Sequence, residues 1–346
     1  MVRLSFDYTT ASKEFDSFIN DHSGVATILI HKNADGDCIS AGLALSLWLQ
    51  NKYNVKVISP NRYSDSFAWL PNSINMLIYD SLFKDAIIDH LKASDIVFCV
   101  DFSQQCRIDD TLAGLLEGKK LFIIDHHPEE PDIIGQRCIN SSATATCEIL
   151  YELFHIIDKK SITEDIAQCL YAGILTDTGK FSTANMTYRV HEIAGEMLKT
   201  NKIDVNEIQR LIYCNNRLVR MRFLGHVLSK CLKIVPGYNV SYITISKEDI
   251  SRFYLHSGDT DGIVNYGLSL KNIKLTAMFK EKKDGIYISF RSIGDFSVNE
   301  LAKQYFNGGG HKNAAGGFST KSLIEAVNDF VNIVKSIPSL NDATKK

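Results

Sequence analysis

The chain lacks the features that mark secreted, membrane-spanning and thiolate-zinc proteins. Its eight cysteines are scattered and form no CxxC pair, which argues against a zinc site built from thiolates and fits a reducing compartment. Residues 1–18 contain no apolar core of a secretory signal. No segment reaches the roughly 18 apolar residues that span a bilayer. We therefore expect a cytoplasmic protein with no membrane partner.

The chain also has little net charge. Its formal net charge is −2, so the chain lacks the excess of basic residues that is typical of proteins that wrap long nucleic acids. A hydrophobic content of 45% and a charged content of 23% are ordinary for a globular protein, and 346 residues favour two domains. This balance is compatible with a small anionic substrate held by metal ions and a few cationic side chains.

Residues 25–50 read as a buried strand, a polar loop and a helix. The apolar run 25–30 is followed by His31, Asp35 and Asp37, and the helical pattern covers 39–50. Imidazole with carboxylates suits manganese, zinc or iron. In an extended segment Asp35 and Asp37 would point to opposite sides and could face two different ions. The alternative is that Asp35, Gly36 and Asp37 simply form a turn.

Two further apolar runs end in the same kind of residue. Residues 96–100 lead into Asp101, and residues 121–124 lead into Asp125, His126 and His127. Helical segments separate the runs, so parallel pairing would bring the same ends of all three strands together. Ligands bind at the carboxyl ends of such strands. The pattern therefore predicts one shared site at that edge of a parallel sheet.

A predicted helix over 164–175, with Thr163 as its N-cap, leads into Asp177. A carboxylate at the carboxyl end of a helix opposes the helix dipole, an arrangement that is easier to understand if a cation lies beside it. The alternative is a solvated loop aspartate. Residues 188–231 are mainly helical in pattern and are interpreted as a connector.

The pattern from residue 233 onward is richer in strands. Strands are predicted at 240–246, 274–281 and 285–292, and helices at 262–270 and 299–305. Arg291 and Ser292 end a strand, and arginine suits bidentate contact with phosphate. In the glycine-rich segment 307–317 the bare backbone could approach an anion, with His311 as an added donor. Ala314 and Ala315 could start a helix after it, and a flexible loop is the alternative.

Five blocks resemble the DHH phosphoesterase superfamily in their order and spacing. They are HKNADGD (31–37), VDFSQQCR (100–107), DHHPE (125–129), LTDTGKF (175–181) and GGGHKNAAGG (308–317). The resemblance extends from about residue 10 to residue 335. It implies an α/β fold: a Rossmann-like DHH catalytic domain with a parallel sheet (1–190), a helical connector (191–231) and a smaller α/β DHH-associated domain with a mixed sheet (232–346). The last block is similar to that of RecJ-like exonucleases and nano-RNases rather than family II pyrophosphatases.

The resemblance implies a two-metal hydrolase that uses two Mn²⁺ ions, with Mg²⁺ or another divalent ion as the alternative. Asp125 would orient a ligand histidine, and His127 would face the scissile phosphate. The implied ligands are His31, Asp35 and Asp101 for one ion and Asp37, Asp101, His126 and Asp177 for the other. The implied substrate-binding residues of the second domain are Arg291, Ser292, Gly309, Gly310 and His311.

One departure from the family pattern lies next to the implied metal ligands. Cys38 follows the DGD block, where the family often has alanine. A thiol there could make the site sensitive to oxidation, but it removes no ligand.

We therefore expect a phosphoesterase that hydrolyses short oligoribonucleotides and also acts on 3′-phosphoadenosine 5′-phosphate. The first alternative is a phosphodiesterase for cyclic or linear dinucleotides. A nucleotide-binding regulator with an idle metal site is an alternative from a different class, and in a third interpretation the His and Asp residues only cap helices and form turns. A homodimer is compatible with the sequence.

Overall fold

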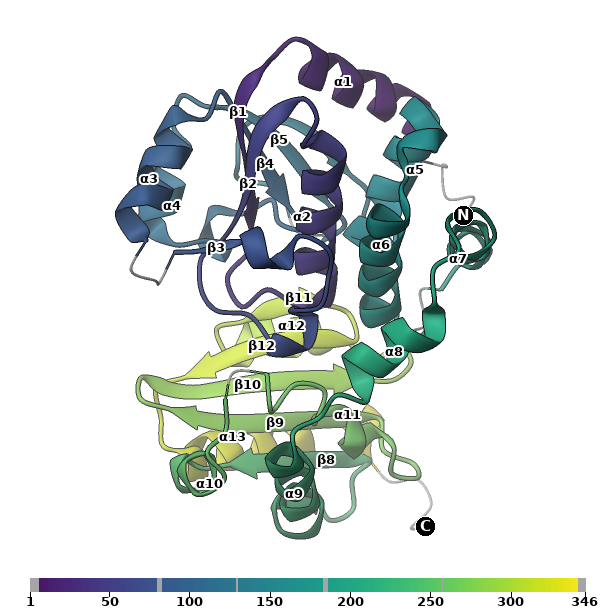
Figure 1. Ribbon diagram of the computed structural model, residues 1–346. Helices are drawn as coiled ribbons and strands as arrows, with labels where there is room; N and C mark the ends of the chain where they lie inside the picture. The colour runs from purple at the N-terminus through teal and green to yellow at the C-terminus, as the bar shows by residue number, and fades with distance from the viewer. Residues whose placement is uncertain (1–5, 80–82, 129, 183–185, 257, 342–346) are drawn as a thin grey trace. The chain divides into compact units, whose positions relative to one another are not determined.

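The computed structural model describes residues 6–79, 83–128, 130–182, 186–256 and 258–341. The chain divides into two compact units, 1–215 and 216–346. Each unit is built on its own six-stranded sheet (Figure 1). The expected α/β architecture, with a parallel sheet followed by a mixed sheet, is confirmed.

The first sheet is parallel throughout, with strand order β3-β2-β1-β4-β5-β6. The three predicted apolar runs form its adjacent central strands. The short strands β3 and β6 were not predicted, because two to four residues carry too little pattern. The strands are β1 (Gly24–Ile30), β2 (Tyr53–Ser59), β3 (Leu77–Ile78), β4 (Ile96–Val100), β5 (Lys120–Asp125) and β6 (Gln136–Ile139).

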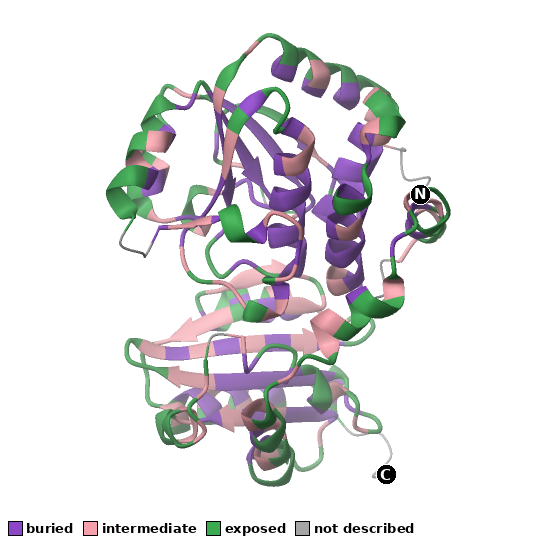
Figure 2. Cartoon of the chain, viewed as in Figure 1, coloured by how far each residue is buried: buried purple, intermediate pink, exposed green. Residues whose placement is uncertain are grey.

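Helices cover both faces of this sheet, which explains why its central strands are apolar throughout. Side chains alternate along β4: Phe98 packs in the core beneath α1, α2, α5 and α6, whereas Val97 and Cys99 pack beneath α3 and α4. Figure 2 shows the central strands as buried. The helices are α1 (Tyr8–Asn20), α2 (Gly36–Leu49), α3 (Lys84–Ala93), α4 (Asp110–Gly114), α5 (Thr146–Asp158), α6 (Glu164–Asp177), α7 (Tyr188–Asn201) and α8 (Val205–Tyr213).

The structure differs from the sequence prediction at the start of α2. Asp35 and Asp37 do not lie in an extended segment: Asp35 is the N-cap of α2 and Asp37 lies in its first turn. Apolar residues recur at helical spacing over residues 81–93, and this segment forms α3 from Lys84 onward, whereas residues 81 and 82 lie outside the described residues. The N-cap role of Thr163 is confirmed, and α6 ends at Asp177 as expected.

The second sheet has the strand order β11-β12-β10-β9-β8-β7 and is antiparallel except where β8 pairs with β9. One face packs against α12 and α13, and the other contacts α9 and α11. The elements are α9 (Leu218–His226), β7 (Leu232–Ile234), β8 (Val240–Ile245), α10 (Lys247–Arg252), α11 (Asn265–Leu268), β9 (Leu275–Lys282), β10 (Gly285–Ser292), α12 (Val298–Tyr305), β11 (Gly309–His311), β12 (Ala314–Ser319) and α13 (Leu323–Lys335).

The glycine-rich segment is a β-hairpin at the edge of this sheet. The expectation that Ala314 and Ala315 start a helix is wrong, because both residues pair with Arg291 and Phe290 of β10. A Cβ atom at Gly310 would lie 2.6 Å from the Ala314 carbonyl oxygen, so the hairpin itself requires glycine there. The helix expected over 262–270 is shorter, at 265–268.

Candidate metal centre

The predicted residues meet where the strand order of the first sheet reverses. From β1 the chain continues to β2 and β3 on one side and returns to β4 on the other, and a crevice at such a switch point is where open α/β sheets bind ligands. His31 follows β1 and Asp101 follows β4. Asp125 ends β5 and His126 comes directly after it. The shared edge that the sequence predicted is therefore present.

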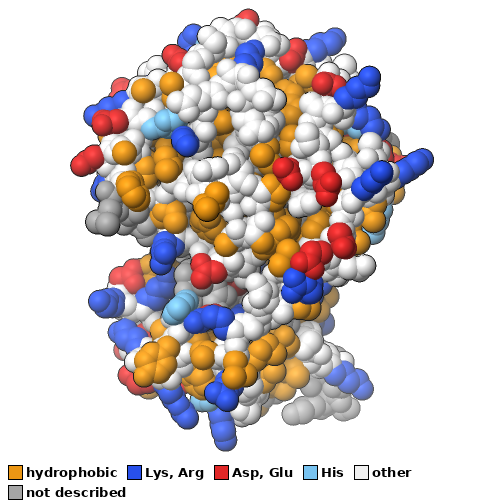
Figure 3. All heavy atoms as spheres, viewed as in Figure 1, with side chains coloured by type: hydrophobic (Ala, Val, Ile, Leu, Met, Phe, Trp, Pro, Cys, Tyr) orange, Lys and Arg blue, Asp and Glu red, His pale blue; other side chains and the backbone are white. Residues whose placement is uncertain are grey.

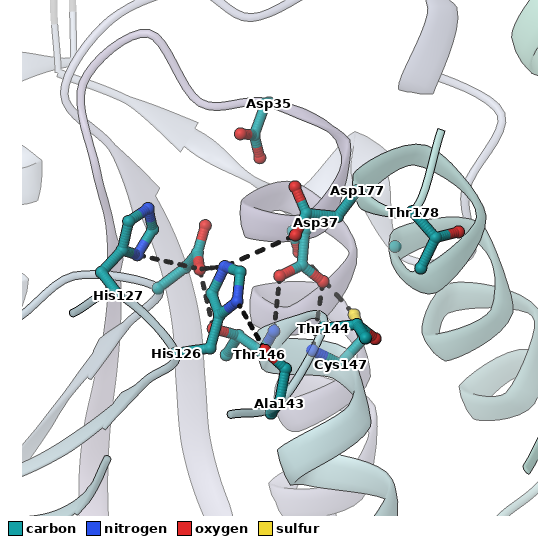
Figure 4. A network of polar contacts seen from close by, with 12 residues as sticks. Asp35, Asp37, His126, His127, Ala143, Thr144, Thr146, Cys147, Asp177 and Thr178 are labelled. Atoms are coloured by element: carbon teal, nitrogen blue, oxygen red, sulfur yellow. Dashed lines mark hydrogen bonds and ion pairs between the residues drawn. The ribbon is translucent and has the colours of Figure 1, made fainter. Parts of the chain in front are cut away.

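Three pairs of side-chain atoms lie at nearly the same separation. His31 Nε2 is 3.4 Å from Asp101 Oδ2. His126 Nε2 is 3.6 Å from Asp101 Oδ1. It is 3.5 Å from Asp177 Oδ2 (Figure 4). These separations exceed a normal hydrogen bond. They match the spacing of neighbouring ligand atoms around a divalent ion whose metal–ligand bonds are about 2.1 Å long.

The tautomers of the two histidines strengthen this interpretation. His31 Nδ1 contacts the Lys32 carbonyl oxygen at 2.9 Å, and His126 Nδ1 contacts the Ala143 carbonyl oxygen at 3.4 Å. A carbonyl oxygen only accepts, so each neutral ring keeps its proton on Nδ1 and turns the Nε2 lone pair toward a carboxylate. Among the described residues, buried His31 Nε2 has no hydrogen-bond partner. A cation between these facing acceptors would remove the repulsion.

Asp37 is fixed by the amino-terminal end of a different helix. Its Oδ2 accepts a hydrogen bond from Thr146 N at 2.6 Å and its Oδ1 accepts one from Cys147 N at 3.1 Å. These are the first two residues of α5, whose N-cap residue, Ala145, offers no side-chain bond. The helix dipole favours an anion there. Ligand atoms of Asp37, His126 and Asp177 lie within 4.8 Å of one another.

Asp101 lies at the middle of the centre. It faces both His31 and His126, and its backbone adopts a left-handed conformation with φ of 67°, which is uncommon outside glycine and often marks functional positions. Thr146 Oγ1 donates to Asp101 Oδ1 at 2.7 Å. Sequence reasoning missed Thr146. The run of small and hydroxyl residues over 141–146 was its only local signal.

Asp35 stands apart from the other predicted ligands. It is exposed, and its Oδ1 accepts a hydrogen bond from Cys38 N at 3.1 Å as the cap of α2. Among the described residues, Asp35 is in none of the groups whose ligand atoms lie within 4.8 Å of one another. Its carboxylate still acts electrostatically on Asp37 and Asp177. The structure thus brings together five of the six predicted ligands and places Asp35 at their margin (Figure 4).

The clustered carboxylates differ in their proton affinity. Burial, with the nearby Asp101 and Asp177 charges, raises the pKa of Asp37 well above its usual range. Burial also raises the pKa of Asp177 to about 7, and the Asp35 and Asp101 charges add to this. Burial alone would raise the pKa of Asp101, but the His31, His127 and His126 imidazoles outweigh it and hold that pKa below its usual range. Strongly shifted carboxylates in a cluster are typical of functional sites.

Asp125 contacts His127 rather than a predicted ligand histidine. Its Oδ1 lies 2.7 Å from His127 Nδ1 and also accepts a hydrogen bond from His127 N at 3.1 Å. Burial would lower the pKa of His127, but the hydrogen bond to Asp125 and the charges of Asp101 and Asp125 outweigh it and raise that pKa to about 9. His127 is therefore protonated at neutral pH in the metal-free protein.

The predicted substrate-binding residues of the second unit lie on β10 and on the hairpin. Arg291 Nη1 donates to the Phe290 carbonyl oxygen at 2.9 Å. The Ser292 hydroxyl is buried, donates to the Phe296 carbonyl oxygen at 2.7 Å and accepts from Asn313 Nδ2. Gly310 N donates to Asn299 Oδ1 at 3.1 Å. The contacts of Ser292 and Gly310 hold β10 and the hairpin in shape.

The parallel sheet, with imidazoles and carboxylates gathered at its switch point, defines an α/β protein with a candidate metal centre. The chain belongs to the DHH family. The family model described as "DHH family, N-terminal domain" matches residues 26–174, and the model described as "DHHA1 domain" matches residues 237–338. One match lies within each compact unit, and together they support a phosphoesterase whose clustered residues could hold metal.

Relatives of this chain match it over most of their length. It is 28% identical over 294 residues to the "probable bifunctional oligoribonuclease and PAP phosphatase" of Streptococcus mutans, covering 84% of this chain and 88% of that protein. It is 26% identical to the corresponding Bacillus subtilis protein, with the same coverage of 84% and 88%. The crystal structure of an exopolyphosphatase-related protein from Bacteroides fragilis matches with a TM-score of 0.87 and 31% identity, covering 95% of this chain and 96% of that one.

Among the described residues, no helix has the length and apolar character needed to cross a membrane. On the face shown in Figure 3, basic and acidic side chains are interspersed, as expected from the small net charge of −2.

Proposed function

We propose that this protein is a metal-dependent phosphoesterase that hydrolyses short oligoribonucleotides and 3′-phosphoadenosine 5′-phosphate. The observation that carries the proposal is the convergence of His31 and His126 on Asp101, with His126 also facing Asp177, so that imidazole nitrogens face carboxylate oxygens. The names of the Streptococcus mutans and Bacillus subtilis relatives support this choice of substrates.

Two manganese ions fit the donor set of this centre, since imidazole nitrogen and carboxylate oxygen suit manganese. Paired divalent ions supply a hydroxide nucleophile at neutral pH and stabilise charge on phosphate oxygens. Asp101, which faces both histidines, would bridge the ions. One ion would be held by His31, Asp35 and Asp101, and the other by Asp37, Asp101, His126 and Asp177.

His127 is the acid of the proposed reaction. Asp125 holds its Nδ1 at 2.7 Å, which fixes the ring and leaves Nε2–H as a donor. The hydrogen bond to Asp125 and its charge favour the protonated ring, and the imidazolium can donate a hydrogen bond to a phosphate oxygen or a proton to the leaving oxygen. Asp125 thus acts as the positioning residue for His127.

The second unit would bind the substrate through Arg291, the hairpin and His311. The arginine guanidinium is a planar fork of donors that matches phosphate oxygens. Ser292 and Gly310 would support this surface through the hydrogen bonds that they make within the unit. Arg291→Ala should raise KM for RNA more than it lowers kcat, and an equal KM in the variant would remove Arg291 from the binding site.

The test is turnover by the purified full chain with Mn²⁺. Initial rates are compared on RNA of two to about ten nucleotides, on 3′-phosphoadenosine 5′-phosphate and on cyclic dinucleotides. Asp101→Ala should abolish hydrolysis, and Asp89→Ala, which alters an exposed aspartate of α3, should leave it unchanged. Far-UV circular dichroism establishes that both variants fold. Parent-like turnover by folded Asp101→Ala would overturn the assignment of the centre.

Turnover, together with measurements of binding and of thermal melting, separates the alternatives. A dinucleotide phosphodiesterase would prefer cyclic dinucleotides over short RNA. A nucleotide-binding regulator would bind metal and nucleotide without turnover, and a purely structural cluster would melt at the same temperature with and without a chelator.

A further inference from the structure

A second group of ligand-type side chains lies inside the second unit. His226 ends α9, Cys231 ends the segment that follows it, and Asp249 lies in α10. One ligand atom from each lies within 4.8 Å of the other two. None of these residues takes part in the centre formed by β1, β4 and β5. The group is therefore independent of the proposed catalytic function.

An unusual turn of helix brings His226 and Cys231 together. Residues five apart in an α-helix project about 140° away from each other. Here Val227–Cys231 forms a π-helical turn, in which hydrogen bonds span five residues, as from Leu232 N to the Val227 carbonyl oxygen. Single π-helical turns are rare and frequently occur at functional sites. The wider turn lets Cys231 share a side of the segment with His226.

Asp249 is held in a position where it could act as a third metal ligand. Its Oδ2 accepts hydrogen bonds from Ser246 N at 3.1 Å and Ser246 Oγ at 3.0 Å, forming the capping box of α10. Its Oδ1 is 2.9 Å from His226 Nε2. One carboxylate oxygen is thus fixed by the backbone while the other points to the imidazole. Such outer support is what orients ligands in metal sites.

We propose that His226, Cys231 and Asp249 form a second metal site, which takes zinc or a similar borderline-soft divalent ion. Imidazole, thiolate and carboxylate are the three ligand types of protein zinc sites. A thiolate favours zinc over manganese, so this site would differ in metal preference from the oxygen-rich centre of the first unit. Three protein ligands leave a fourth position for water.

The environment of the group fits a partly enclosed ion. His226 and Asp249 are each 19% exposed, and Cys231 is 6% exposed beside the buried Phe223 and Val227. An ion could therefore enter from solvent past the imidazole. Burial and the Asp249 charge raise the pKa of Cys231 to about 11, so binding replaces the thiol proton with the metal and releases that proton to solvent.

The ion would join α9 to α10. Residues of both helices pack in one cluster with Ile243 and Ile245 of β8. A ligand that binds the folded state alone raises the melting temperature. Zinc bound at this site should therefore stabilise the second unit.

The test uses the full-length protein, stripped of metal and titrated with Co²⁺ and then Zn²⁺. Co²⁺ should produce a thiolate-to-metal charge-transfer band in the parent and in Cys214→Ser, which removes an exposed thiol, and the band should be lost or reduced in Cys231→Ser. The parent should bind one more zinc ion than Cys231→Ser and than His226→Gln. The exposed His256 provides the matched control, His256→Gln, which should bind as the parent does.

A second measurement keeps the test decisive if Cys231→Ser fails to fold. In the parent, zinc should protect Cys231 from alkylation, mapped by mass spectrometry, whereas manganese at the same concentration should not. Hydrolysis of short RNA with Mn²⁺ should be equal in the parent and in folded His226→Gln. An unchanged cobalt band and zinc content in Cys231→Ser, or no zinc protection of Cys231 in the parent, would overturn the proposal and leave His226 and Asp249 as an ion pair between two helices.

Discussion

His31 and Asp101 face each other across the switch point of the first sheet, with Nε2 of the imidazole 3.4 Å from Oδ2 of the carboxylate. Because His31 Nδ1 contacts the Lys32 carbonyl oxygen, the neutral ring presents a lone pair to the carboxylate. Two buried acceptors at this separation repel each other unless a cation or a proton lies between them. The geometry of the site therefore depends on the groups that hold the Asp101 carboxylate in place.

Thr146 is the residue that tests this dependence. Its Oγ1 donates to Asp101 Oδ1 at 2.7 Å, so Thr146→Val should leave the carboxylate misoriented. Loss of a hydrogen bond to a metal ligand typically costs 10–100-fold in metal affinity or activity. We expect a loss of that size in manganese affinity, measured by calorimetry, and a matching fall in the rate of RNA hydrolysis.

Thr146→Ser is the matched control, since it keeps the hydroxyl and should retain most of the affinity. Both variants keep the backbone N–H that donates to Asp37. Equal affinity in Thr146→Val and the parent would mean that Asp101 is positioned without the hydroxyl.

The approach of α6 to α2 and α5 gives a second prediction. A Cβ atom at Gly173 of α6 would overlap Cys147 Sγ and lie 2.8 Å from Asp37 Oδ1. Gly173→Ala should therefore displace Asp37 and destabilise the fold by about 1–3 kcal/mol, the usual cost of overpacking. Chemical denaturation gives the stability, and manganese titration should show weaker binding.

The comparison residue is Gly195 in α7, where an added Cβ would meet nothing within 4 Å. Replacing a helical glycine with alanine ordinarily stabilises by roughly 0.5–1 kcal/mol, so Gly195→Ala should raise stability and leave the hydrolysis rate unchanged. A stabilised, fully active Gly173→Ala would show that the helices can separate at no cost to the site.

Proton release on metal binding gives a third prediction. Burial and neighbouring charges raise the pKa of Asp177 to about 7 and that of Asp37 well above its usual range. Metal ligands must be deprotonated, so binding near neutral pH expels protons. The apparent affinity for Mn²⁺ should rise from about pH 6 to about pH 8, by roughly tenfold per pH unit for each proton released.

Calorimetry in buffers of different ionisation enthalpy counts the released protons. Removal of metal by a chelator should also lower the melting temperature, because metal binds the folded state. Equal affinity across this range, with no proton release, would place the ions away from Asp37 and Asp177.

The sequence predicted the parts of the site that are local to a strand end. His31, Asp101 and the Asp125-His126 pair each follow a buried apolar run, and parallel pairing brings such ends together. Thr146 could not be predicted in the same way, because its contact with Asp37 joins residues 109 positions apart. That contact depends on how the start of α5 docks against α2, which no local pattern records.

The hairpin of the second unit shows a different limit of prediction from the sequence. Alanine favours helices, so Ala314 and Ala315 were predicted to start one. Pairing with Phe290 and Arg291 of β10 outweighed that local preference, since strand formation depends on neighbours across the sheet. The glycines were interpreted as anion-binding backbone, whereas Gly310 is also required by the close approach of Ala314.

Asp125 and His127 provide the last prediction. Asp125→Asn keeps an oxygen that can accept from His127 Nδ1 but removes the negative charge that helps to raise the pKa of His127 to about 9. If His127 is the acid, its pKa should fall and the alkaline limb of the rate profile should move to lower pH. The loss in kcat should be about 10²–10³-fold, within the range for general acid–base catalysis, with a smaller change in KM.

The control for this variant is Asp132→Asn, which alters an exposed loop carboxylate that accepts from Gln105 N at 2.7 Å. It should keep the parent kcat and pH profile. The decisive readout is the position of the alkaline limb, because general damage to the fold would lower the rate at every pH without moving that limb. A folded Asp125→Asn with the parent kcat and an unmoved limb would remove His127 from the role of acid.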